Sequence, residues 1–215
     1  MSGGFEPNIA RNLQFFQEQN TIPKGSTVAL DLVAGCGFQA IPLAQLGYRV
    51  TAIDLDRQLL NELSANASGL TIDTVEDDLI NFERYLTGKA ELIVCMTDTL
   101  LHLESKEKVC SLIAKVFAGL ENGGQFIITC RDLSSELSEL QRFIPVKSDS
   151  NTIFTCFLEY EPQTVKVHDL VYQRNNGDWQ LNKSFYRKLR LSQQWVERQI
   201  TKVGFREVKS ELDRG

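Results

Sequence analysis

Short β-rich runs and helix-length segments alternate through the first 130 of the 215 residues, and this alternation constrains the fold more than any other feature. Strands separated by helices of about 10 to 15 residues favour right-handed βαβ crossovers and a parallel sheet covered on both faces. The sequence therefore predicts an α/β fold with a doubly wound, mostly parallel Rossmann-like sheet. The expected strands are 27–32, 48–53, 70–75, 91–96 and 125–130, and the expected helices are 8–20, 38–46, 56–66, 79–86 and 105–120.

The pattern changes after residue 130. A helix is predicted at 132–142, and three β-rich runs at 152–160, 164–172 and 179–189 predict an antiparallel meander added to the sheet. Ser192 is a suitable N-cap for a helix that ends at Gly204, and a last strand is expected at 205–210.

We expect one domain over residues 1–215. Its parts are a nucleotide-binding core (1–130), a substrate-side helix with antiparallel strands (131–191) and a closing helix and strand (192–215).

Composition narrows the possible partners. Lysine and arginine number 23 against 28 aspartates and glutamates, so the formal net charge of −5 argues against a nucleic-acid partner. No apolar run reaches the roughly 18 residues of a membrane span, and the opening residues lack the features of a secretion signal. The five cysteines are odd in number and form no C-x-x-C pair, which indicates reduced core residues. We therefore expect a cytoplasmic protein with no membrane partner and no metal.

A glycine-rich turn joins the first expected strand to a helix. Residues 31–38 read Asp-Leu-Val-Ala-Gly-Cys-Gly-Phe, and such a turn lets a ligand approach the backbone at the positive end of a helix. The second strand ends at Asp54, whose carboxylate is placed to accept hydrogen bonds from a ribose diol, and the third ends near Asp78. Since open α/β sheets bind ligands at the carboxyl ends of their strands, these acids indicate a nucleotide site.

Two interpretations of this turn are open. Residues 35–40, Gly-Cys-Gly-Phe-Gln-Ala, also satisfy the dinucleotide pattern G-x-G-x-x-A, which would make the protein an NAD(P)-dependent oxidoreductase. The antiparallel meander that replaces a second nucleotide-binding half argues against this alternative, and Asp31 is not part of that fingerprint.

The same residues resemble the class I S-adenosylmethionine-dependent methyltransferases, whose loop is usually D-x-G-x-G-x-G or D-x-A-C-G-x-G. The segments Leu-Glu-Asn-Gly-Gly (120–124) and Val-Gly-Phe (203–205) resemble this family's L-x-P-G-G and A-G-F. The resemblance implies that Asp31, Gly35 and Gly37 hold the methionine end of the cofactor. It further implies that Asp54 holds the ribose, and that Asp78 and the Leu79 amide hold the adenine. The full expected cofactor-binding set is Arg11, Asp31, Gly35, Gly37, Phe38, Asp54, Leu55, Asp78, Leu79 and Met96.

The chain departs from the family pattern in two places. Val33 stands where the family has a small residue. The family's final antiparallel strand normally inserts between the fifth and sixth strands, yet the sequence stops at Gly215. Either a strand of the meander fills that slot, or the chain is truncated.

The fourth strand leads into Ile93–Leu103, which resembles the I-C-L-G-N-S-F-x-H-L segment of glycine N-methyltransferases, and residues 185–191 resemble the same family's K-F-R-L-S. The resemblance implies that Arg131 holds a substrate carboxylate. Asp98 replaces the family's Asn, and a carboxylate there would repel a substrate carboxylate but could orient an amine or accept its proton. Asp98 and His102 are the candidate catalytic residues, and Asp98 and Arg131 the candidate substrate-binding residues.

Each of these residues has a structural alternative. Asp98 could be a helix N-cap, Arg131 could form a surface ion pair, and His102 could be a hydrogen-bonded structural residue. The meander's aromatic residues could form a wall around a substrate or could pack on the sheet face. These are Tyr160, Tyr172, Trp179 and Tyr186.

The sequence therefore predicts a methyltransferase that uses S-adenosylmethionine, releases S-adenosylhomocysteine and transfers a methyl group by direct displacement to nitrogen or oxygen of a small-molecule acceptor. The alternatives are the oxidoreductase and a non-catalytic S-adenosylmethionine-binding protein. The sequence names neither the acceptor nor the oligomeric state.

Overall fold

A parallel five-stranded sheet forms the core of the computed structural model, which describes residues 4–211. Its strand order is β3-β2-β1-β4-β5, and every neighbouring pair is parallel, as the alternation predicts. The strands are β1 (Val28–Asp31), β2 (Arg49–Asp54), β3 (Ile72–Glu76), β4 (Ala90–Cys95) and β5 (Leu120–Ile128).

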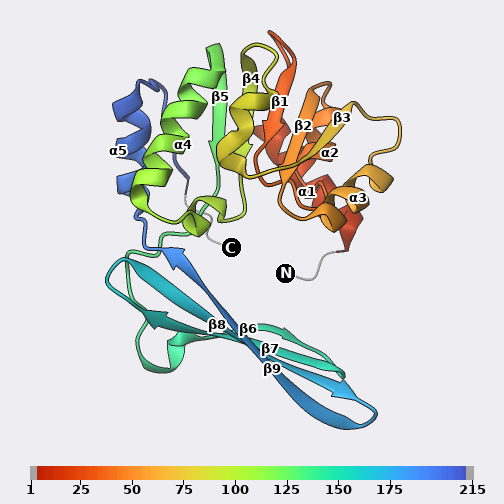
Figure 1. The fold of residues 1–215 in the computed structure, drawn as a ribbon, viewed down its shortest axis with the longest axis vertical. Helices are drawn as coiled ribbons and strands as arrows, with labels where there is room; N and C mark the ends of the chain where they lie inside the picture. The colour runs from red at the N-terminus through yellow and green to blue at the C-terminus, as the bar shows by residue number, and fades with distance from the viewer. Residues whose placement is uncertain (1–3, 212–215) are drawn as a thin grey trace.

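Helices cover both faces of this sheet (Figure 1). One face packs on α1 (Phe5–Glu18), α2 (Ala40–Gln45) and α3 (Arg57–Asn66), and the other on η1 (Leu79–Tyr85), α4 (Lys106–Gly119) and α5 (Gln193–Val203). Neighbouring positions of each strand serve opposite faces: Ala52 belongs to the first core and Ile53 to the second. The short 3-10 turn η2 (Thr99–His102) follows β4. No helix within residues 4–211 is long and apolar enough to cross a membrane.

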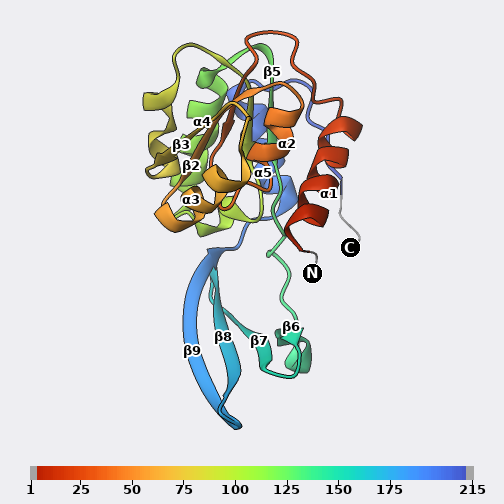
Figure 2. The same cartoon turned by 90° about the vertical axis from the view of Figure 1, so that its right-hand side faces the viewer.

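A second, antiparallel sheet lies at the carboxyl edge of the core (Figures 1 and 2). Its order is β6-β7-β8-β9, with β6 (Phe143–Ser148), β7 (Thr152–Tyr160), β8 (Thr164–Asn175) and β9 (Asp178–Leu189). The antiparallel meander is thus confirmed, with one more strand than predicted, but the expectation that it is added to the parallel sheet and fills the slot beside β5 is wrong, because its strands pair only with one another. None of its strands joins the parallel sheet, so β5 is an edge strand in the described part of the chain.

The helix expected at 132–142 is wrong. The segment is irregular apart from the 3-10 turn η3 (Glu139–Arg142). Arg190 donates hydrogen bonds to the carbonyls of Leu133 and Ser134, and the Asp132 carboxylate accepts from the Ser134 and Gln193 amides. These contacts take up groups that a helix would use for its own hydrogen bonds.

The strand expected at 205–210 is also wrong. Ser192 caps α5 by accepting from the Trp195 amide, and Gly204 ends it with a φ of 118°, as predicted. The chain beyond then packs through a side chain instead of a hydrogen-bond ladder. The Phe205 ring lies 5.0 Å from the ring centroid of Phe117 and 6.1 Å from that of Phe126. Residues 212–215 of the predicted closing segment lie outside the described residues.

Candidate active site

The carboxyl ends of the five parallel strands bring the predicted site residues to one edge of the sheet. The strand order places the ends of β3, β2 and β1 on one side, and those of β4 and β5 on the other. Asp54 and Asp31 end β2 and β1, whereas Asp98 and Arg131 follow β4 and β5. Chain order reverses between β1 and β4, which is where open α/β sheets bind ligands. The expected cofactor residues and acceptor residues thus occupy adjacent halves of this edge.

The glycine-rich loop is built around two left-handed residues and Asp54. Gly35 and Gly37 have φ of 51° and 100°, and a Cβ on Gly37 would lie 2.8 Å from Leu63. A Cβ on Gly35 would meet nothing within 4 Å, so the backbone there is open to approach. The Asp54 carboxylate accepts from the amides of Gly35 (2.8 Å) and Asp56 (2.9 Å), which fixes the loop against β2.

Asp31 is a buried carboxylate without a partner. The residue is 1% exposed, and neither oxygen has a hydrogen-bond partner among residues 4–211. Burial raises the pKa of Asp31 to about 7, and the nearby Asp54 adds to this rise. The Val33 and Ala40 amides, which face the carboxylate without completing a hydrogen bond to it, oppose the rise. A buried carboxylate is costly unless a cation or a donor satisfies it. This position suits a ligand that carries an ammonium group.

A small pocket lies beside this loop, lined by Leu32, Val33, Asp54, Leu55, Asp77 and Leu79. Asp77, which the sequence analysis did not select, lines it in place of the expected Asp78. The Asp77 carboxylate accepts from Tyr85 Oη (2.6 Å) and Asn81 Nδ2 (2.8 Å), while Asp78 caps η1 by accepting from the Ile80 amide. Neighbouring acids at a strand end are not told apart by sequence; only the start of η1 separates their roles. Val33, which departs from the family pattern, also lines this pocket.

The other expected cofactor residues are spread around the loop. Leu55 is 72% exposed on the pocket's rim, and Met96 is buried after β4. Phe38 packs against Phe5 of α1, with ring centroids 5.5 Å apart. Arg11 lies on the exposed side of α1 and donates to Asn8 Oδ1 (2.9 Å).

Asp98 and Arg131, chosen separately from the sequence, contact each other. Asp98 Oδ1 accepts from the Arg131 amide (2.7 Å), and Oδ2 accepts from Arg131 Nε (2.7 Å) and Lys188 Nζ (2.8 Å). Burial alone would raise the pKa of Asp98, but the hydrogen bonds and charges of Lys188 and Arg131 outweigh it and hold the pKa below its usual value. The N-cap alternative for Asp98 is wrong, because its side chain makes no capping bond to η2.

Lys188 of β9 is the residue that sequence reasoning missed. Its contact with Asp98 spans 90 positions, and both side chains are 9% exposed. The available signal was its place within residues 185–191, the segment that resembles K-F-R-L-S.

His102 lies beside this cluster on η2. Its ring centroid is 5.4 Å from that of Tyr186 on β9. Burial lowers the pKa of His102, the cations Lys188 and Arg131 lower it further, and Asp98 opposes them. The lowered pKa favours the uncharged imidazole, which is the form able to accept a proton.

The four aromatic residues of the meander do not form one wall. The strand register places Tyr160 and Tyr186 on the same face as Val165 and Val167, with Tyr186 near His102. Tyr172 and Trp179 lie on the opposite face and are 41% and 45% exposed.

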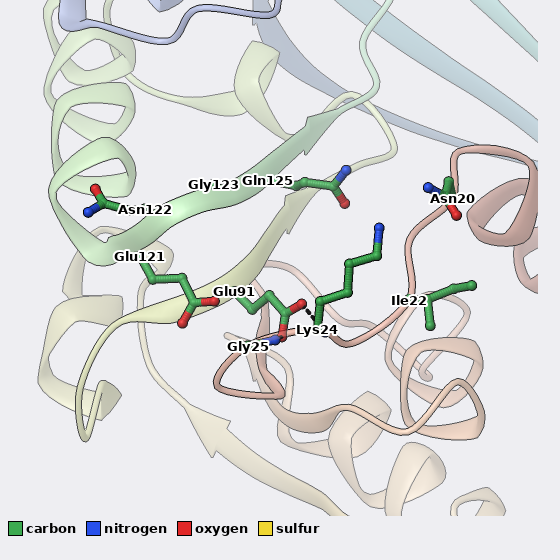
Figure 3. A pocket seen from close by; sticks show the side chains of 9 residues that line it. All are labelled: Asn20, Ile22, Lys24, Gly25, Glu91, Glu121, Asn122, Gly123 and Gln125. Atoms are coloured by element: carbon green, nitrogen blue, oxygen red, sulfur yellow. Dashed lines mark hydrogen bonds between the residues drawn. The ribbon is translucent and has the colours of Figure 1, made fainter.

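A larger pocket lies at the amino edge of the sheet, away from these residues (Figure 3). Its buried carboxylate, Glu91, accepts from the backbone amides of Lys24, Gly25 and Thr27. Glu91 is satisfied within the protein, so its role there is to hold the loop before β1.

Comparison with known proteins agrees with this geometry. Residues 29–124 match the family model described as "Methyltransferase domain". Among solved structures, a methyltransferase from Clostridium acetobutylicum superposes with a TM-score of 0.73 at 17% identity, covering 92% of this chain and 79% of that one. The core has the class I S-adenosylmethionine-dependent methyltransferase fold. The fold and the family resemblance predicted from the sequence are confirmed.

Curated relatives match the same region. A glycine/sarcosine N-methyltransferase from Aphanothece halophytica is 26% identical over 117 residues, which are 54% of this chain and 44% of that protein. A glycine/sarcosine/dimethylglycine N-methyltransferase from Actinopolyspora halophila is 27% identical over 117 residues, 53% of this chain and 21% of that protein. The chain thus spans less than half the length of these methyltransferase relatives.

Proposed function

We propose that this methyltransferase domain binds S-adenosylmethionine at the edge formed by β1, β2 and β3 and is catalytically active. The observation that carries the proposal is the buried, unpartnered Asp31 carboxylate at the end of β1, four residues before the open backbone of Gly35. A ligand ammonium satisfies this carboxylate. Asp54 retains lone pairs for ribose hydroxyls, and the pocket beside Leu79 and Asp77 offers apolar walls for adenine. The residues present therefore fit the cofactor.

The cofactor supplies a sulfonium methyl group that an uncharged nitrogen or oxygen displaces directly. The protein's task is then to hold the acceptor in line with that methyl group, which contributes several kcal/mol, up to about 7 to 11 by effective-molarity estimates. We assign this task to the cluster of Asp98, Arg131 and His102 after β4 and β5. We assign to His102, whose lowered pKa favours the uncharged imidazole, the acceptance of the proton that the methylated nitrogen releases.

The acceptor we propose is a small molecule with an anionic group. The sequence suggested that Asp98 would repel a carboxylate, but Arg131 and Lys188 both pair with Asp98, so these three residues carry a net charge of about +1. The Arg131 side chain is 74% exposed and contacts Asp98 through Nε, while the backbone amide of Arg131 donates to the other carboxylate oxygen; among residues 4–211 this leaves the terminal guanidinium nitrogens for a substrate. The names of the curated relatives favour nitrogen as the methylated atom. We further propose a cytoplasmic location, which the five free cysteines support.

Calorimetry tests the cofactor site. S-adenosylmethionine, S-adenosylhomocysteine and NADH are titrated into the wild type, into Asp54→Ala and into the matched control Asp73→Ala, an exposed acid on β3. We expect micromolar binding of both adenosyl ligands to the wild type and the control, with marked weakening in Asp54→Ala. Binding of NADH alone would support the oxidoreductase, and the absence of adenosyl binding would overturn the proposal.

Methyl transfer is then assayed with glycine, sarcosine and an amino sugar as acceptors. Turnover of any of them by the wild type supports an enzyme. Cofactor binding without turnover of any acceptor in a broad amine and acid panel would favour a non-catalytic binding protein.

A further inference from the structure

The strand β9 contains a buried lysine, Lys188, at the point where the strand passes from exposed to buried. The first ten residues of the strand are exposed, and only the last two, Lys188 and Leu189, are buried. Lysine is rarely buried unless it is paired. Lys188 Nζ lies 2.8 Å from Asp98 Oδ2, and this ion pair joins the antiparallel sheet to the parallel one.

The partner of Lys188 lies on a strained turn. Thr97 and Asp98 both have left-handed backbones, with φ of 59° and 66°. Such strain in non-glycine residues persists only where surrounding contacts hold it, and it is concentrated at functional sites. Here the Thr97 and Asp98 amides donate to Thr129, while the Asp98 side chain takes three donors from Arg131 and Lys188.

We propose that Lys188 is a positioning residue of the acceptor site, which holds Asp98 and Arg131 in place and sets the charge around His102. This inference rests on the proposed function. Without the lysine, Asp98 keeps Arg131 as its sole cationic partner and the positive charge beside the imidazole is reduced. Lys188 thus acts through its neighbours.

The groups around His102 make this charge effect measurable. They are Asp98 after β4, Arg131 after β5, and Lys188 and Tyr186 of β9. Of these, Lys188 and Arg131 lower the pKa of His102 and Asp98 raises it. Removal of the Lys188 charge leaves Asp98 less compensated, so the pKa of His102 rises.

The test is an NMR titration of the two histidines of the intact chain, without any ligand. In Lys188→Met we expect the pKa of His102 to rise by about half to one unit. The resonances of His168, which pairs with Glu159 on the other face of the antiparallel sheet, are recorded in the same spectra as an internal reference. Lys188→Arg restores the wild-type value, and Lys183→Met, an exposed lysine of the same strand, leaves it unchanged. An unchanged pKa of His102 in Lys188→Met would overturn the inference.

A second variant protects the test against misfolding. Lys188→Gln retains a donor for Asp98 but removes the charge, so it should fold and still raise the pKa of His102. Calorimetry with S-adenosylmethionine on the same samples separates the two proposals. A wild type that does not bind the ligand contradicts the proposed function, whereas an unmoved His102 contradicts only the role of Lys188.

Discussion

The two sheets of this protein differ in how far their side chains are buried. All six residues of β4 in the parallel sheet are buried, and helices cover both faces. In the antiparallel sheet, one face packs on a small core around Val165 and Val167, while the other leaves aromatic side chains such as Phe185 exposed. The expected cofactor acids Asp31 and Asp54 end strands of the parallel sheet, whereas Lys188 lies at the end of a strand of the antiparallel one. In the proposed function, stability and cofactor binding therefore belong to the first sheet, and acceptor positioning belongs to the junction of the two.

The largest expected difference between the two sheets is in the free energy of unfolding, and matched leucine substitutions should show it. Leu92 of β4 is fully buried and Leu181 of β9 is 40% exposed. Leu92→Ala is expected to reduce the free energy of unfolding by about 2 to 5 kcal/mol, because it leaves a cavity in a core that cannot collapse freely. Leu181→Ala should cost less than about 1 kcal/mol. Urea denaturation measures both values, and equal losses would refute the comparison.

The affinity for the cofactor should depend on the parallel sheet and not on the antiparallel one. Asp54→Ala is expected to weaken S-adenosylmethionine binding by about ten- to a hundredfold, because a charge-assisted hydrogen bond is worth about 1.5 to 3 kcal/mol. Lys188→Met should leave this affinity unchanged, since Lys188 contacts Asp98 and not the glycine loop. Calorimetry decides the point. A comparable loss in both variants would mean that the second sheet takes part in cofactor binding.

The pH dependence of binding should arise from the parallel sheet. With a pKa of about 7, Asp31 becomes protonated in the ligand-free protein as the pH falls below neutrality. A protonated Asp31 cannot pair with an ammonium, so the affinity for S-adenosylmethionine should fall by up to about tenfold per pH unit below 7. Asp31→Asn should bind weakly at every pH and lack this slope. Calorimetry between pH 5.5 and 8 provides the measurement.

The smallest expected effect lies where the chain returns to the core after β9. Ser192 caps α5 through a hydrogen bond from the Trp195 amide, and Ser192→Ala should cost about 1 kcal/mol of unfolding free energy. Ser184→Ala, on the exposed part of β9, is the matched control and should have no measurable effect. Thermal denaturation of both variants checks this. A large loss in the control would show that the exposed face of the antiparallel sheet contributes more than its burial suggests.

Sequence reasoning succeeded where one local pattern determines the structure. The alternation of strands and helices predicted that neighbouring strands of the core pair in parallel. Gly35 and Gly37 indicated where the loop takes left-handed backbone conformations. It failed where distant contacts decide. Arg190 takes the carbonyls that a helix at 132–142 would need, and the Phe205 ring packs on α4 and β5 in place of a strand ladder.

The candidate site shows the same division. Asp98 and Arg131 were found through their neighbours in sequence, yet their pairing with each other and with Lys188 depends on three separate elements. Asp77 and Asp78 are neighbouring residues of the same type, so the sequence does not tell their roles apart. The start of η1 decides that Asp77 lines the pocket and that Asp78 caps η1.

In the proposed function, the unpartnered Asp31 couples the binding of a cationic ligand to the release of a proton. Because its pKa lies near 7 in the ligand-free protein, the folded chain retains a proton there that the unfolded chain releases near the ordinary value of 3.8. The free energy of unfolding should therefore decline as the pH rises between these values. A cation that enters the site below neutrality displaces that proton into the solvent. The apparent enthalpy of binding would then vary with the ionisation enthalpy of the buffer, and a drop in the surrounding pH would favour release of the ligand.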